Sequence, residues 1–295
     1  MKKHLPLLLL CLCLSAPGPS RLWAGQAAEI LGELPNGQIN WSQGVLDVKS
    51  SFFMARQQTD QDSASPGEKE SRARRQITPI LMQNLALIKI NASQYVSDLI
   101  TQDVTIRDKL GEMAQAAPIT TFEEQPDGRV EIGVQMQLNG GFAQLILPSD
   151  IKQVETIKAV SSADTQSGES AQPDMAPGNA TEAKAYTGLI VDARGIGAQP
   201  ALAPVLTAEN GKEVYGPAFI SREYAVHNGI CSYVRSIGDA DQSRTGANPL
   251  VVKGLRTVKE KTCDIVISNA DASRLLGSSA HLAFLKECRV VIVLD

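Results

Sequence analysis

The chain has 295 residues, 43% of them hydrophobic, and a formal net charge of −4. This length suits two domains of ordinary size, each with its own hydrophobic core. Aromatic residues make up only 4% of the sequence and no basic patch stands out, which argues against nucleic acid as a partner and against an extended stacking surface.

Residues 1–27 have the three parts of a cleavable secretory signal. Two lysines form the positively charged start, an apolar run covers 5–14, and prolines end it before Ala24 and Ala27, after either of which we expect cleavage. A transmembrane helix needs roughly 20 apolar residues, so a membrane anchor is disfavoured. We expect a periplasmic protein, at most peripheral to the outer membrane, with no transmembrane segment in the mature chain.

Residues 37–150 are predicted to form the first domain. It begins with one long or bent strand over 39–53 and continues with a helix over 68–90. Apolar residues recur in that helix at spacings of three, four and seven, which is typical of one helix face. They are Ala73, Ile77, Ile80, Leu81, Leu85 and Ile88. Pro79 lies inside this pattern and either kinks the helix or starts a second one.

The rest of the first domain changes from helical to strand periodicity. Short helices are expected around 95–100 and 106–113, followed by a strand at 119–124. Asp127-Gly128 is a hairpin turn signal, and the strict alternation over 130–138 predicts a half-buried antiparallel strand. Helices on one face of an antiparallel sheet make this an α+β domain.

Residues 153–185 separate the two domains. The segment is rich in Ser, Ala, Gly, Pro and acidic residues and has no apolar period, so we expect a flexible, disordered linker. The second domain, 186–295, is predicted to be mostly β with one or two small helices. Its expected strands are 188–193, 201–207, 213–215, 231–234, 249–253 and 290–294. Asn269 or Asp271 is expected to cap a helix over 273–276.

The five cysteines fall into two groups. Cys11 and Cys13 lie in the predicted signal and follow leucines instead of the small residue of a lipidation site, so we expect no lipid anchor. Of the other three, Cys263 and Cys288 each precede an apolar run, and neighbouring strands would bring them together as a disulfide. The alternative is that Cys231, Cys263 and Cys288 are three buried thiols.

Two short patterns resemble catalytic or cofactor motifs. Residues 194–197 read Arg-Gly-Ile-Gly after a predicted strand, but prolines follow where a dinucleotide-binding helix must begin. Residues 149–152 fit the Ser-x-x-Lys pattern of penicillin-binding enzymes, but the chain has no Lys-Thr-Gly motif. We interpret the first as a turn and the second as a helix cap, and we expect Asp192 and Arg194 to form a structural ion pair.

His227 belongs to a set of residues that could in principle bind a metal. It shares a helical i, i+4 spacing with Cys231, and Cys263 and Cys288 would complete four ligands. None of these spacings matches a zinc-binding pair, so we expect no metal, no cofactor and no catalytic residues.

Two stretches resemble known bacterial domains. Residues 68–147 are similar to the small LPP-type lipoprotein domain, which also occurs in the flagellar outer-membrane-associated protein FlgP and in the first part of the flagellar protein FlgT. The matching positions are Phe122, Asp127-Gly128, Val130 to Val134 and Gly140-Gly141. The second domain resembles a C-terminal module that accompanies this domain in exported proteins of similar length. The resemblance implies no enzyme activity.

The sequence therefore predicts a non-catalytic exported envelope protein. We expect a periplasmic scaffold or accessory component of a surface apparatus such as the flagellum, with envelope or flagellar proteins or a second copy as partners. The alternative is a binding module for a small ligand or cell-wall glycan, with the 194–197 turn and the Tyr215-Gly216 corner as candidate surfaces. A third hypothesis is an enzyme that uses Ser149 or His227.

Overall fold

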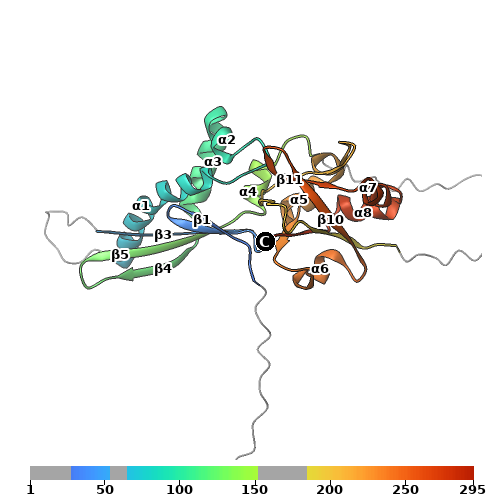
Figure 1. Cartoon of the computed structure of the whole chain (residues 1–295). Coiled ribbons are helices and arrows are strands. Elements are labelled where there is room, and N and C mark those ends of the chain that lie inside the picture. Colours follow the sequence, from blue (N-terminus) through green and yellow to red (C-terminus); the bar gives the residue numbers. More distant parts are fainter. Residues whose placement is uncertain (1–27, 54–64, 152–184) are drawn as a thin grey trace, which may run out of the picture.

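The computed structural model describes residues 28–53, 65–151 and 185–295, which form two domains lying side by side (Figure 1). The first combines an antiparallel sheet with helices, and the second is built on a mixed sheet, so the predicted α+β class is confirmed. The expected secretory signal and the expected linker lie outside the described residues.

The N-terminal domain is a five-stranded antiparallel sheet with three of its helices on one face (Figure 1). The strands run in the order β1-β2-β3-β5-β4. They are β1 (Leu31–Leu34), β2 (Gly37–Asn40), β3 (Val45–Phe53), β4 (Ile119–Glu124) and β5 (Arg129–Gln137). The longest pairing joins β3 and β5, and the alternating apolar residues of β5 point into the core as predicted.

Four helices belong to this domain: α1 (Pro66–Ala86), α2 (Val96–Gln102), α3 (Val104–Ala116) and α4 (Gly141–Ile146). Ser65 and Glu68 form a capping box that starts α1. The predicted apolar stripe of α1 is buried against β3 and β5. The helix continues through Pro79, so the alternative of a second helix beginning there was wrong.

The strand predicted over 39–53 is in fact a hairpin. β2 ends at Asn40, residues 41–44 turn the chain, and β3 returns antiparallel to β2. Gly44 ends the turn with φ +68°, a conformation that L side chains rarely adopt. The turn places Trp41 at the domain boundary, where it packs against the cores of both domains.

The C-terminal domain is built on a seven-stranded sheet in the order β8-β7-β11-β10-β6-β12-β9. The strands are β6 (Gly188–Asp192), β7 (Leu206–Ala208), β8 (Glu213–Tyr215), β9 (Ser232–Val234), β10 (Pro249–Val258), β11 (Lys261–Ile267) and β12 (Val290–Val293). β6 runs parallel to both β10 and β12, β12 runs parallel to β9, and β11 to β7, whereas β10–β11 and β7–β8 are antiparallel. Only the end of the strand expected at 201–207 is a strand.

The C-terminal domain has more helix than the sequence indicated. Within 185–295 there are four α-helices instead of one or two: α5 (Arg222–Asn228), α6 (Gln242–Thr245), α7 (Asn269–Leu276) and α8 (Ser279–Lys286). α5 and α6 are too short to show a clear apolar period. The cap of α7 is Ser268, whose Oγ accepts a hydrogen bond from the main-chain amide of Asp271 at 3.0 Å, so both predicted caps were one or more residues late.

Main-chain hydrogen bonds join the two domains. The amides of Leu202 and Ala203 donate to the carbonyls of Lys89 and Ile90 at 3.1 and 2.7 Å. Elsewhere along the boundary, the amide of Gly140 donates to the carbonyl of Val226 in α5 at 2.7 Å. Because these bonds use main-chain groups that water would otherwise satisfy, they orient the domains as well as connect them.

Arg222 makes side-chain hydrogen bonds across the boundary. Its guanidinium donates to the carbonyls of Pro148 at 2.8 Å and Gln144 at 2.7 Å, at the C-terminal end of α4. Hydrogen bonds from a charged donor typically contribute about 1.5–3 kcal/mol each, with the low end applying to partly exposed pairs. We expect Arg222→Met to lower the free energy of unfolding in urea by about 2 kcal/mol.

Arg256→Met is the matched control for this prediction. Arg256 lies exposed on β10, and no described residue forms a hydrogen bond or ion pair with its side chain. We expect its replacement to change the free energy of unfolding by less than about 0.5 kcal/mol. Equal unfolding midpoints for the two variants would show that Arg222 does not couple the domains.

Candidate functional site

A cleft of about 1150 Å³ lies where the two domains meet. The N-terminal domain contributes the residues before β1, the turn after β2 and Asn139, which follows β5. The C-terminal domain contributes one face of α5, the starts of β9 and β12, and the segment around α6. Clefts between domains are a usual place for ligand sites.

The N-terminal wall is held by hydrogen bonds between the two residues before β1 and residues 40–43. The main-chain amide of Ile30 donates to Ser42 Oγ at 2.9 Å. The Glu29 carboxylate accepts from Asn40 Nδ2 at 2.7 Å and from Gln43 Nε2. This wall is therefore a fixed part of the domain, and the negative charge of Glu29 is offset by two amide donors.

Asn139 lies between the two walls. A Cβ atom added to Gly44 would lie 3.4 Å from the Asn139 side chain, and one added to Gly229 would lie 3.2 Å from it. Glycine at these two positions therefore leaves room for the side-chain amide. Neither the amide nitrogen nor the amide oxygen of Asn139 has a hydrogen-bond partner among 28–53, 65–151 and 185–295. It is therefore available to a ligand.

The C-terminal wall depends on Arg244 of α6. Its Nε donates to the carbonyl of Val290 at 2.9 Å, and its Nη1 and Nη2 donate to the carbonyls of Asn228 and Gly229 at 2.7 and 2.8 Å. These carbonyls belong to the end of α5 and the start of β12. Arg244 therefore fixes α5, α6 and β12 relative to one another.

Tyr224, His227 and Asn228 of α5 line the cleft. His227 Nδ1 lies 2.9 Å from the main-chain carbonyl oxygen of Glu223. Because a carbonyl oxygen can only accept, Nδ1 carries the hydrogen, and Nε2 of the neutral ring is an acceptor. Tyr224, 38% exposed, lies on the same helix, and no described residue contacts its hydroxyl by a hydrogen bond.

The cysteines do not form the predicted disulfide: Cys231, Cys263 and Cys288 are free thiols. Cys263 lies on β11 and Cys288 just before β12, and β10 and β6 separate these strands. Three steps of roughly 4.8 Å exceed the Cα separation of up to about 6.8 Å that a disulfide allows. The sequence could not reveal this strand order.

The thiols are held protonated by their surroundings. Burial raises the pKa of Cys231 to about 11 and the pKa values of Cys263 and Cys288 to about 12. We expect iodoacetamide at pH 8 to leave all three unmodified in the folded protein, because the thiolate is the reacting form. When the protein is unfolded without reductant and then treated with iodoacetamide, mass spectrometry should show all three cysteines alkylated. A pair that resists alkylation until reductant is added would show a disulfide.

The four residues weighed and rejected as zinc ligands are only partly brought together. His227, Cys231 and Cys288 line the same cleft, whereas Cys263 lies on β11 and does not. Within the part of the chain that the structure describes, no three His, Cys, Asp or Glu side chains are grouped to hold a metal ion.

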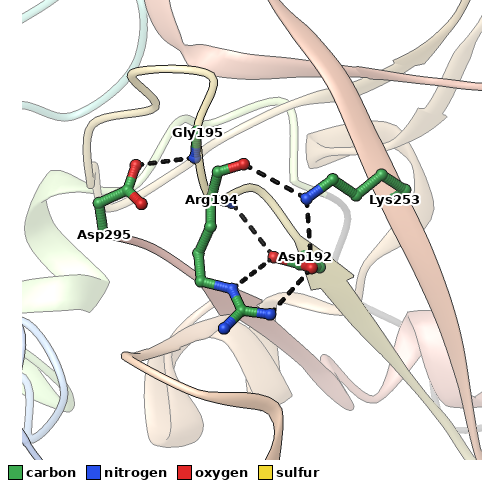
Figure 2. A network of polar contacts seen from close by, with 5 residues as sticks. All are labelled: Asp192, Arg194, Gly195, Lys253 and Asp295. Carbon is green, nitrogen blue, oxygen red and sulfur yellow. Dashed lines mark hydrogen bonds and ion pairs between the residues drawn. The ribbon is translucent and has the colours of Figure 1, made fainter.

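A second polar cluster lies at the carboxyl ends of β6 and β12, and Figure 2 shows its contacts. Arg194 Nε and Nη2 donate to the two carboxylate oxygens of Asp192 at 2.8 and 3.0 Å. Lys253 of β10 pairs with Asp192 at 3.2 Å, and Asp295 accepts from the main-chain amide of Gly195 at 2.9 Å. The predicted Asp192–Arg194 ion pair is confirmed. The polar groups of this cluster are already hydrogen-bonded to one another.

This network should appear in the pH dependence of stability. Hydrogen bonds from Arg194, and next from Lys253, hold the pKa of Asp192 well below its usual range, although burial opposes them. A depressed pKa in the folded state stabilises the protein above the unfolded-state pKa of about 3.9, and this contribution is lost as the pH falls through the folded-state pKa. We expect Asp192→Asn to lower the free energy of unfolding by about 1–2 kcal/mol at pH 7, because its partners are half exposed.

The difference between wild type and Asp192→Asn should shrink as the pH is lowered below about 4. Urea unfolding at pH 7, 5 and 3 measures it. Asp108→Asn removes an exposed ion pair with Arg107 and should change the free energy of unfolding by less than about 1 kcal/mol. A difference for Asp192→Asn that is as large at pH 3 as at pH 7 would contradict the assignment.

The other sequence candidates lie away from the cleft. Residues 194–197 form a turn with Gly195 and Gly197 at positive φ. A dinucleotide-binding motif requires a helix directly after its glycines, and none follows here, so that interpretation is excluded. Ser149 lies in an exposed turn after α4, and Lys152 is outside the described residues. Tyr215 is fully buried and donates to the carbonyl of Ile230 at 2.6 Å, so its corner is not a ligand surface.

Sequence reasoning singled out His227, Cys231 and Cys288, which line the cleft, but missed other residues that form it. Trp41, Asn139, Tyr224 and Arg244 come from four separate segments, and none belongs to a recognisable motif. Trp41 offered the only signal, as one of 2 tryptophans in the chain.

The fold and the cleft define a two-domain α+β protein with a polar cleft between its domains. Its C-terminal domain matches, over residues 188–295, a family model described as Treponema pallidum Tp0624, second domain. No curated protein matches the chain. None of the helices in the described residues is long and apolar enough to span a membrane.

Proposed function

We propose that the chain is a non-catalytic exported envelope protein that serves as a scaffold or accessory component of a surface apparatus such as the flagellum. The observation that carries this proposal is an uncovered apolar face on β10. Val251 and Leu255 are each 45% exposed there, although β10 is the central strand of its sheet. Over 249–253 β10 pairs in parallel with β6, and parallel strands in the middle of a sheet are normally covered on both faces.

The border of this face suggests the chemistry of the partner. Val251, Lys253 and Leu255 are alternate residues and line one side of the strand. Lys253, which pairs with Asp192, lies between the two apolar side chains, and Arg256 is exposed further along the same strand. An envelope protein with an apolar surface and acidic residues around it would be complementary.

The exported, periplasmic location rests on the features of residues 1–27, and the link to flagellar or other envelope machinery rests on the resemblance of 68–147 to the LPP-type domain. N-terminal sequencing of the protein purified from its native envelope tests the location. A mature chain that begins at Gly25 or Ala28 is the expected result, and an intact Met1 in that preparation would contradict export by a cleaved signal.

Site-specific photo-crosslinking in cells tests the scaffold function. A crosslinking amino acid at Val251 should capture an envelope protein, identified by mass spectrometry. The same amino acid at Val104, which is 57% exposed on α3 of the other domain, is the matched control. Equal yields of the same products from both positions, or none from either, would contradict partner binding by the β10 face.

A second candidate function, a binding module for a small ligand or glycan, is favoured by the cleft of about 1150 Å³. A ligand that binds only the folded state raises its melting temperature. Thermal unfolding with candidate ligands therefore tests this function independently of crosslinking.

A further inference from the structure

The charged side chains that line the cleft are mostly bonded to neighbours. Arg244 uses its guanidinium on three main-chain carbonyls, and Arg289 pairs with Glu287 at 2.7 Å. Glu29 accepts from two side-chain amides, and Asp241 accepts from the main-chain amide two residues on at 2.8 Å. A strongly charged ligand would have to compete with these bonds.

The groups that remain available are mostly neutral. Asn139 and Asn228 offer side-chain amides, Tyr224 a hydroxyl, and His227 the acceptor Nε2. Asp239 is the exception, since its carboxylate has no hydrogen-bond or ion-pair partner among the described residues. The available groups therefore include both donors and acceptors, as recognition of several hydroxyl groups requires.

The cleft also offers aromatic surface. Trp41 lines it, and its ring packs edge-on against the Tyr233 ring at 6.1 Å between centroids. Tyr224 lines the opposite wall. A fixed indole combines an apolar face with a polar edge, so it suits a ligand whose rings have C–H faces and hydroxyl edges.

We propose that this cleft binds a neutral oligosaccharide, contacted by Asn139 from the N-terminal domain and by Tyr224, His227 and Asn228 from α5. The inference rests on the second candidate function, ligand binding, and names its ligand class. The cleft volume exceeds the range of about 300–1,000 Å³ typical of pockets for single small molecules, which favours a chain of sugar rings over a monosaccharide.

The test is calorimetric titration of the full-length mature protein with two neutral oligosaccharides, N-acetylglucosamine tetramer and maltotetraose. Citrate and spermidine are titrated in parallel as anionic and cationic probes. We expect at least one oligosaccharide to bind with a measurable dissociation constant, and neither charged probe to do so.

Two variants locate the site. Asn139→Ala and Tyr224→Phe each remove one polar group that makes no hydrogen bond within the folded chain, so folding should be preserved. Each should weaken oligosaccharide binding about three- to tenfold. The matched controls are Gln137→Ala, exposed at the end of β5, and Tyr95→Phe, 44% exposed on the N-terminal domain. Both should bind as wild type does.

The possible outcomes separate the binding site, the ligand class and the binding function from one another. Oligosaccharide binding that Asn139→Ala and Tyr224→Phe leave unchanged would overturn the cleft as its site. Binding of citrate or spermidine alone would overturn the ligand class but keep a binding function. No binding of any probe would overturn both the ligand class and the binding function. The scaffold function is tested separately, by crosslinking at Val251.

Discussion

Arg244→Met is expected to lower the free energy of unfolding by about 3–4 kcal/mol. The substitution removes three hydrogen bonds from a charged donor and leaves the carbonyls of Asn228, Gly229 and Val290 without that partner. Each such bond contributes about 1.5–3 kcal/mol, but the contributions are not additive, and water can reach the exposed end of α5. Methionine keeps much of the apolar stem, so the effect reports mainly the lost bonds.

Urea unfolding, followed by circular dichroism, measures this change, and Arg289→Met is the control from the same cleft. Among the described residues, the Arg289 side chain forms only a partly exposed ion pair with Glu287, so its replacement should change the free energy of unfolding by less than about 1 kcal/mol. Arg244→Met should also increase hydrogen exchange at the end of α5, which the guanidinium holds. Similar stability of the two variants would show that Arg244 does not organise this wall.

Periodic elements were the predictable part of the fold. The α1 stripe and the alternation of β5 follow from a 3.6-residue and a 2-residue period, and both are confirmed because each element buries a single face. The hairpin at 41–44 was missed because Ser-Gln-Gly is a weak turn signal inside an apolar stretch. The strand order of the C-terminal sheet has no local signature, and the disulfide between Cys263 and Cys288 was predicted wrongly for that reason.

The cleft was less predictable than the fold because it is a product of domain assembly. Asn139 and Tyr224 are 85 residues apart in sequence and belong to different domains, so no spacing connects them. Asp192 and Arg194, only two residues apart, were paired correctly because their contact is local. Contacts between near neighbours can be read from a sequence, whereas a site shared by two domains depends on how their surfaces meet.

Tyr233→Phe is expected to lower the free energy of unfolding by about 2–4 kcal/mol. Tyr233 is 3% exposed, and its hydroxyl bridges the main chain of Ala201: it donates to the carbonyl at 2.7 Å and accepts from the amide at 3.0 Å. Phenylalanine would leave a buried donor and a buried acceptor unsatisfied, and each such group costs about 1–3 kcal/mol.

The bridge matters beyond its own two bonds because Ala201 precedes the residues that bond to the N-terminal domain. The amides of Leu202 and Ala203 donate to Lys89 and Ile90. We therefore expect Tyr233→Phe to raise hydrogen exchange at Leu202 and Ala203 as well as to lower the urea midpoint. Tyr224→Phe, which removes a hydroxyl without a partner from an exposed ring, should leave both unchanged. Protected amides at 202 and 203 in Tyr233→Phe would show that the domain contact holds without the bridge.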